Sequence, residues 1–205
     1  MSKREQRCAG ITELRVDTSA EGGLPVIEGH AAIFDSLSQD LGAIFPFKEK
    51  IRMGAFRQSL ERDDVRALWN HDPNYVLGRN RAGTLELAET VKGLLVRIHP
   101  PDTQWARDLT ESIKRGDVSQ MSFGFICEKD TWTVENGEDV RTLERVKLFD
   151  VSPVTFPAYL DTDVGVRSVL DEYKAHKAEQ EKRAREDAKR KAEFDRLKNK
   201  FKINN

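Results

Sequence analysis

Short runs in which apolar and polar side chains alternate recur through the first 151 residues, separated by turn-forming residues. A period of two places every second side chain on the same face, which is typical of strands that are half-buried in a sheet. Asn136-Gly137 stands between two such runs and predicts a tight hairpin, because both positions of that turn favour positive φ. We predict strands at residues 11–16, 26–34, 65–71, 84–88, 94–99, 119–127, 131–135 and 140–151.

Two stretches depart from this pattern and predict helices. A short helix is expected around residues 55–60, and a longer one where Trp105, Leu109 and Ile113 recur every four residues, with Gly116 as its end. The expected fold class is therefore α+β, with an antiparallel, barrel-like core of strands flanked by helices.

The end of the chain has a different character. Residues 171–205 contain no glycine or proline and carry 12 of the 34 basic and 8 of the 35 acidic residues, so the tail is basic and the body acidic. This composition predicts one long, charged helix. We expect two parts, residues 1–167 and a helical tail at 168–205. The tail is either a solvated helix or a tether that docks through Phe194, Leu197 and Phe201.

Composition also excludes several classes of protein. The formal net charge of -1 provides no overall field for nucleic acid, so no specific nucleic-acid partner is expected. Two cysteines are too few for a disulfide framework, and the first residues lack a secretory signal. No stretch has the roughly 18 uncharged apolar residues of a membrane helix. We expect a soluble, unsecreted protein of a reducing cytoplasm, without a membrane partner.

Metal and cofactor sites are not indicated. The histidines at 30, 71, 99 and 176 stand singly, and neither a paired-cysteine nor a histidine–glutamate metal motif occurs. Glycine-rich phosphate-binding loops are absent from the sequence as well. The expected chemistry uses no cofactor and no metal.

Ser122 is the best-placed candidate nucleophile. Alternation along its strand assigns Phe123 and Phe125 to the apolar face, and Ser122 with Gly124 to the opposite face. Glycine leaves room for a substrate backbone, and the backbone amides of Phe123 and Gly124 are candidates to hold an oxyanion. A serine without a chemical role on the solvated face of a strand fits the same pattern.

A serine hydroxyl needs a base near neutral pH, and histidine is the usual proton acceptor. His71 ends the predicted strand 65–71, before the turn-forming residues HDPN, so its imidazole leaves the strand beside apolar packing. A histidine that only caps a strand fits this position too. His99 precedes two prolines, and His30 lies in an apolar strand, where it is either a core residue or a supporting partner.

The third member of such a set accepts the other imidazole N–H. Asp150 suits this role because it stands between Phe149 and Val151 at the end of the last long strand, where a buried carboxylate needs a cation or a donor. A carboxylate that caps a turn beginning at Ser152 is an equally good interpretation.

Taken in order, these segments resemble the prohead (procapsid maturation) protease family of tailed bacteriophages, whose fold is related to the herpesvirus assemblins. The combination of NHD, SFGF and SPVTFPA is specific, although each piece alone is not. The resemblance spans roughly residues 24–165. It is carried by GHAAIFDSLS at 29–38, IRMGAFRQSL at 51–60, LWNHDPNYVLGR at 68–79, GTLEL at 83–87, DVSQMSFGF at 117–125 and DVSPVTFPAY at 150–159.

The resemblance implies a serine endopeptidase packaged inside the immature capsid in the host cytoplasm. Such an enzyme removes the scaffolding domain or segment of the major capsid protein and commonly digests itself. His71 is then the general base and Ser122 the nucleophile. Since the related herpesvirus enzymes are dimers, a homo-oligomer is expected by analogy.

The third catalytic residue is left open by the resemblance. The family often has glutamate at the position of Asp150, and the herpesvirus enzymes use a second histidine, so His30 and His99 are alternatives. Because aspartate is one methylene shorter than glutamate, Asp150 must approach the imidazole more closely or act through water.

Two other functions remain as alternatives. A non-enzymatic, scaffold-like assembly protein would use the sheet domain only to bind coat subunits. A serine esterase for small molecules is disfavoured because the chain has no G-x-S-x-G motif and no alternation of helices and strands.

Overall fold

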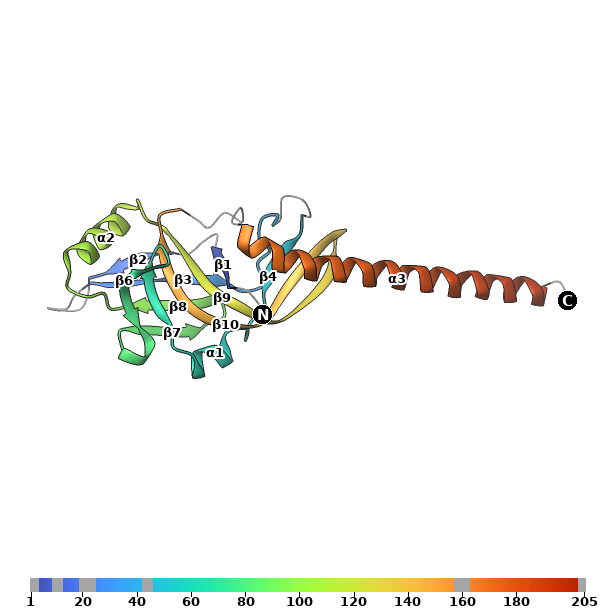
Figure 1. The fold of residues 1–205 in the computed structure, drawn as a ribbon, viewed down its shortest axis with the longest axis horizontal. Coiled ribbons are helices and arrows are strands. Elements are labelled where there is room, and N and C mark those ends of the chain that lie inside the picture. Colours follow the sequence, from blue (N-terminus) through green and yellow to red (C-terminus); the bar gives the residue numbers. More distant parts are fainter. Residues whose placement is uncertain (1–3, 9–12, 19–24, 42–45, 157–162, 203–205) are drawn as a thin grey trace. The chain divides into compact units, whose positions relative to one another are not determined.

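A computed structural model describes residues 4–8, 13–18, 25–41, 46–156 and 163–202 (Figure 1). The chain divides into two compact units, Met1–Gly165 and Val166–Asn205. The described part of the first unit is mostly sheet, with a few short helices. The predicted α+β class is therefore confirmed.

Six of the described strands form the larger sheet, in the order β1-β9-β10-β5-β6, with β4 also paired to β10. Strands β9 and β10 form its long central hairpin, and both turn residues, Asn136 and Gly137, have positive φ as the sequence predicts. The strands are β1 (Glu5–Cys8), β4 (Lys48–Ile51), β5 (Arg66–Trp69), β6 (Asp72–Arg79), β9 (Gln120–Glu135) and β10 (Glu138–Val154).

The smaller sheet has the order β2-β3-β8-β7, and each neighbouring pair is antiparallel. Its strands are β2 (Arg15–Asp17), β3 (Val26–Ile33), β7 (Leu85–Glu89) and β8 (Gly93–Ile98). In each sheet the first and the last strand of the order are different strands that do not pair with each other. The described strands therefore form two open sheets and no closed barrel. The larger sheet is also mixed in direction, because β10 is long enough to pair in parallel with both β4 and β5.

The two sheets share one core with the helices. Ile27 and Val96 of the smaller sheet belong to the same buried apolar cluster as Phe123 and Val151 of the larger sheet. Helix α2 (Gln104–Arg115) adds three of its buried side chains, and Gly116 ends it in the left-handed conformation, as predicted. Helix α1 (Arg57–Arg62) lies between β4 and β5 in the chain, and η1 (Asn80–Ala82) follows β6.

Several strand predictions need correction. The strands expected at 119–127 and 131–135 are one strand, β9, because its pairing with β10 continues through both. Strands β1, β4 and β6 were not predicted, since their sequences are too short or too polar to show clear alternation. The strand expected at 11–16 falls partly outside the described residues, and β2 begins at Arg15.

The second unit contains most of helix α3 (Asp163–Lys202). Glu179 with Arg183 and Glu181 with Arg185 form ion pairs one turn apart on its exposed surface. Phe194 is exposed, while the side chains of Leu197 and Phe201, which complete the predicted docking patch, lie outside the described residues. Among the described helices, none is both long and apolar enough to cross a membrane.

Candidate active site

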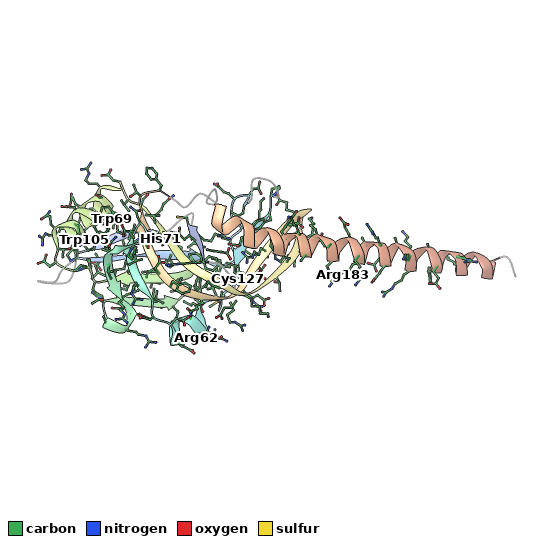
Figure 2. The ribbon with its side chains drawn as sticks, viewed as in Figure 1. Arg62, Trp69, His71, Trp105, Cys127 and Arg183 are labelled. Atoms are coloured by element: carbon green, nitrogen blue, oxygen red, sulfur yellow. The ribbon has the colours of Figure 1, made fainter. Side chains whose placement is uncertain are left out.

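A two-residue turn between β5 and β6 presents His71. Trp69 pairs with Asp72 across the hairpin, which leaves only Asn70 and His71 in the loop, and both have positive φ, 53° and 59°. This is the twist that two-residue hairpins favour, but it is unusual for a histidine. The turn therefore lies two residues earlier than the predicted HDPN turn, and His71, labelled in Figure 2, is the second of its two central residues.

Asn70 fixes this turn against the end of β10. Its backbone N–H donates to the Pro153 carbonyl at 3.0 Å, and its side-chain amide exchanges hydrogen bonds with Thr155. Asparagine also tolerates the left-handed conformation better than most residues. Asn70 therefore helps to hold His71 against the strand that carries Asp150.

Ser122 lies on β9, opposite Ser152 of β10 on one side and Cys8 of β1 on the other. Its Oγ is 2.7 Å from Nε2 of His71 and 2.9 Å from the carbonyl oxygen of Arg7. The face that the sequence assigned to solvent is covered here, and Ser122 is 0% exposed. The β1 strand explains this difference, because alternation along β9 carries no information about a strand 115 residues earlier.

A β-bulge directs Asp150 toward the same place. Leu148 pairs with Phe125 and Asp150 with Gly124, so Phe149 is an extra residue on β10. Without it Asp150 would share the core face of Leu148, and the bulge moves the carboxylate to the other face. Since β10 continues to Val154, Asp150 does not cap a turn at Ser152.

The Asp150 carboxylate is almost completely buried and has several donors. Its Oδ2 is 2.5 Å from Nδ1 of His71 and accepts the Ser152 hydroxyl at 3.0 Å, while Oδ1 pairs with the Arg4 guanidinium. Burial alone would raise the pKa of Asp150, but the hydrogen bond and charge of His71, with Arg4 and Ser152, lower it below its usual value. The carboxylate is therefore charged near neutral pH.

The three side chains form a continuous series from Ser122 through His71 to Asp150. With Asp150 accepting from Nδ1, the neutral imidazole presents Nε2 as an acceptor to the serine hydroxyl. This arrangement can generate a nucleophilic oxygen at the serine. Asp150, one methylene shorter than glutamate, was expected to approach the imidazole closely or to act through water. Its carboxylate contacts His71 directly.

The alternative histidines have other neighbours. Nε2 of His99 is 2.9 Å from Glu86, and Nδ1 of His30 is 3.8 Å from a Glu13 oxygen. Burial, together with the charge of Lys92, lowers the pKa of His30. Nδ1 of His71 is in contact with Asp150, and neither His30 nor His99 takes that place in the arrangement described.

The predicted oxyanion donors, the backbone amides of Phe123 and Gly124, lie in a strand with a neighbour on each side. Phe123 is opposite Arg7 and Val151, and Gly124 is opposite Gln6 and Asp150. The amides of a central strand are used by its two ladders. Their oxyanion role stays a prediction, and it requires an amide released from β1 or β10.

Sequence reasoning missed Arg4, Asn70 and Ser152. Ser152 could have been predicted from the sequence, because residues 150 and 152 share a face when the strand continues through both. Arg4 gave no signal, since its contact spans 146 positions of sequence. The described residues contain no group of three or more histidine, cysteine or acidic side chains placed to hold a metal ion.

Comparison with known proteins identifies the family of the chain. Residues 12–178 match the family described as caudovirus prohead serine protease. The chain belongs to this family. It is therefore a serine protease of the kind that acts in bacteriophage capsid maturation.

Two individual proteins are similar to it. The prohead protease of Enterobacteria phage HK97 is 28% identical over 163 residues, which covers 78% of this chain and 67% of that protein. The solved structure of the bacteriophage T4 capsid assembly protease has a TM-score of 0.48 and 12% identity, covering 74% of this chain and 97% of that one.

Proposed function

We propose that Ser122 is the nucleophile of this prohead protease, His71 its general base and Asp150 the acid that orients the imidazole. The observation that carries the proposal is the pair of contacts made by His71, 2.7 Å to Ser122 and 2.5 Å to Asp150. Since the three residues come from β9, the β5–β6 turn and β10, the fold brings together groups that lie far apart in sequence.

Peptide cleavage would proceed by acyl transfer. Ser122 Oγ attacks the carbonyl carbon of the scissile bond while its proton passes to Nε2 of His71. The imidazolium, stabilised by Asp150, then donates that proton to the departing amine. A water molecule then attacks the acyl-serine and gives a proton to His71. His71 passes this proton to Ser122 Oγ as the ester bond breaks, which releases the new carboxyl end and regenerates the serine.

We propose further that the substrate is the scaffolding domain or segment of the major capsid protein, cleaved inside the prohead, and that the enzyme also cleaves itself. The support is membership of the prohead protease family together with the name of the HK97 relative. The serine-protease identity of the family favours this over a purely scaffold-like role. A homo-oligomer is part of the same proposal.

Co-expression with the major capsid protein of the same phage tests both substrates. Intact-mass measurement should show a shortened capsid protein and fragments of the protease with the wild-type chain, but neither with Ser122→Ala. Ser112→Ala is the matched control, because Ser112 is a half-buried residue of α2 whose hydroxyl donates to the Asp108 carbonyl of the same helix, its one described side-chain bond. Full-length capsid protein beside the wild-type chain would contradict the proposed substrate.

A further inference from the structure

Strand β1 covers the proposed nucleophile. A protease serine must reach the carbonyl carbon of a peptide and later a water molecule, yet Ser122 is 0% exposed. Cys8 of β1 lies opposite Ser122 in the ladder, and the Arg7 carbonyl oxygen is 2.9 Å from Oγ. The chain's own backbone therefore occupies the position that a substrate carbonyl must approach.

We propose that the edge of β9 beside Ser122 is the binding site for an extended peptide, and that residues Arg4–Cys8 fill it in the arrangement described. This inference rests on the proposed role of Ser122. Proteins commonly bind extended peptides by adding them as a strand at a sheet edge, with main-chain hydrogen bonds for affinity and side-chain pockets for specificity. Strand β1 is the last strand of its sheet, only four residues long, and its described ladder is with β9 alone.

The contact with Arg7 also opposes the first chemical step. Ser122 has a single hydroxyl hydrogen, so while it is donated to the Arg7 carbonyl it is not donated to Nε2 of His71. Proton transfer to the base then requires the hydroxyl to turn away from β1. When β1 leaves, the hydroxyl is exposed, and so is the edge of β9 that paired with it.

A second contact links Arg4, the residue just before β1, to the acid of the site. The Arg4 side chain, 48% exposed, pairs with Oδ1 of Asp150. It reaches the carboxylate over Gly124, where a Cβ atom would lie 3.1 Å from one guanidinium nitrogen of Arg4 and 3.2 Å from another. The absence of a side chain at Gly124 thus makes room for an arginine that enters from the surface.

A buried ionic cluster holds β1 in place. Arg7 pairs with Glu49 of β4 at 2.7 Å, and Glu5 pairs with Arg141 of β10 at 3.0 Å. Burial disfavours the charges of Arg7 and Arg141, but Glu49 and Glu5 outweigh it and raise the pKa of both. Asp130 is a further partner of Arg141.

The composition of this cluster is compatible with exchange of the strand. Since β1 contributes one anion and one cation, its departure leaves the net charge of the cluster unchanged, and Arg141 keeps Glu49 and Asp130 as partners. Glu49 stays paired with Arg141 but loses its contact with Arg7, so it favours a basic side chain at the position of Arg7 in an incoming strand. An extended peptide with a basic residue there is thus the expected ligand.

The rate at which a small fluorophosphonate labels Ser122 tests this inference. We compare the full chain with a chain that lacks residues 1–8, after confirming by circular dichroism that both are folded. The shortened chain should label at least tenfold faster. A peptide of sequence REQRC should slow it again, whereas the same peptide with the Arg7→Glu change should not. Equal labelling of the two chains would overturn the inference and leave the proposed function standing.

If Ser122 reacts in neither of the two chains, the proposed function is overturned, and the inference with it. If the shortened chain does not fold, hydrogen exchange of the full chain decides. Binding of the peptidyl boronate Ac-Arg-Glu-Gln-boroArg at Ser122 should accelerate amide exchange in residues 4–8. Unchanged protection of residues 4–8 with the boronate bound to Ser122 would overturn the inference.

Discussion

Gly124 and Asp150 face each other across the β9–β10 ladder so closely that a Cβ atom at position 124 would lie 2.4 Å from Oδ1 of Asp150. The carboxylate therefore occupies the space that any other residue would fill with its side chain. Because the same carboxylate contacts His71, the smallest side chain on β9 is a condition for the geometry of the site.

Gly124→Ala should displace the Asp150 carboxylate and with it His71. A misplacement of about 1 Å costs roughly 100-fold in rate, so we expect kcat/KM for a peptide substrate to fall by about that factor. Thr133→Ala, at an exposed position of the same strand, should leave kcat/KM unchanged. Activity like that of the wild type in a folded Gly124→Ala chain would contradict this account of the site.

Asn70→Ala should reduce kcat more than it changes KM. The substitution removes the side-chain hydrogen bonds to Thr155 and the residue type suited to positive φ, so His71 is held less firmly. We expect a loss of about tenfold in kcat, a small fraction of what positioning can contribute. Asn74→Ala is the matched control, because its described side-chain bond is to the neighbouring Asp72. Equal effects of the two substitutions would exclude a positioning role for Asn70.

Asp150→Asn tests the charge of the buried acid. Its lowered pKa means that the ionised form stabilises the fold above the unfolded-state pKa of about 3.9, and that this stabilisation disappears as the pH falls through the folded-state value. Urea unfolding should therefore show a wild-type advantage over Asp150→Asn at pH 6 to 7 that shrinks below about pH 4. A difference that is independent of pH would contradict a charged Asp150.

The same substitution should also disturb catalysis. An asparagine amide that faces Nδ1 favours the wrong imidazole tautomer, and this change costs roughly 10⁴ in kcat in the serine–histidine–aspartate template. Steady-state hydrolysis of a peptide substrate at pH 7 to 8 measures the loss. Nearly full activity would mean that Asp150 does not orient His71.

Arg141→Met should destabilise the fold strongly. Arg141 is completely buried and pairs with Glu5, Glu49 and Asp130. Its removal leaves Arg7 to offset both Glu5 and Glu49 and takes a cationic partner from Asp130. Breaking a buried ion pair in this way costs about 3–5 kcal/mol. Chemical denaturation should show a loss of that size. Arg145→Met, on the same strand, removes a half-exposed side chain that pairs with Glu128 and should cost less than about 1 kcal/mol.

Local pattern was enough to predict the α+β class, the 136–137 hairpin and the α2 helix, because each depends on neighbouring residues. It also singled out the three side chains that the structure brings together. Alternation identified the face of Ser122, and the demand of a buried carboxylate for donors identified Asp150. These inferences use the chemistry of single strands and turns.

The remaining features depend on contacts between distant segments. The cover over Ser122 comes from β1, whose four residues carry no clear alternation, and the partner of Asp150 is Arg4, the residue just before that strand. The bulge at Phe149 reverses the face that simple parity assigns to Asp150. The parallel pairing of β4 and β5 with β10, which replaces an antiparallel barrel-like core, likewise depends on which strands meet after the chain has turned.

Peptide mapping after prolonged incubation with a fluorophosphonate tests whether Ser122 is a nucleophile activated by His71. A single adduct is expected on Ser122 in the wild-type chain, and this adduct should be lost in His71→Ala. An adduct on a different serine, or equal labelling of Ser122 in the two chains, would contradict this role of Ser122.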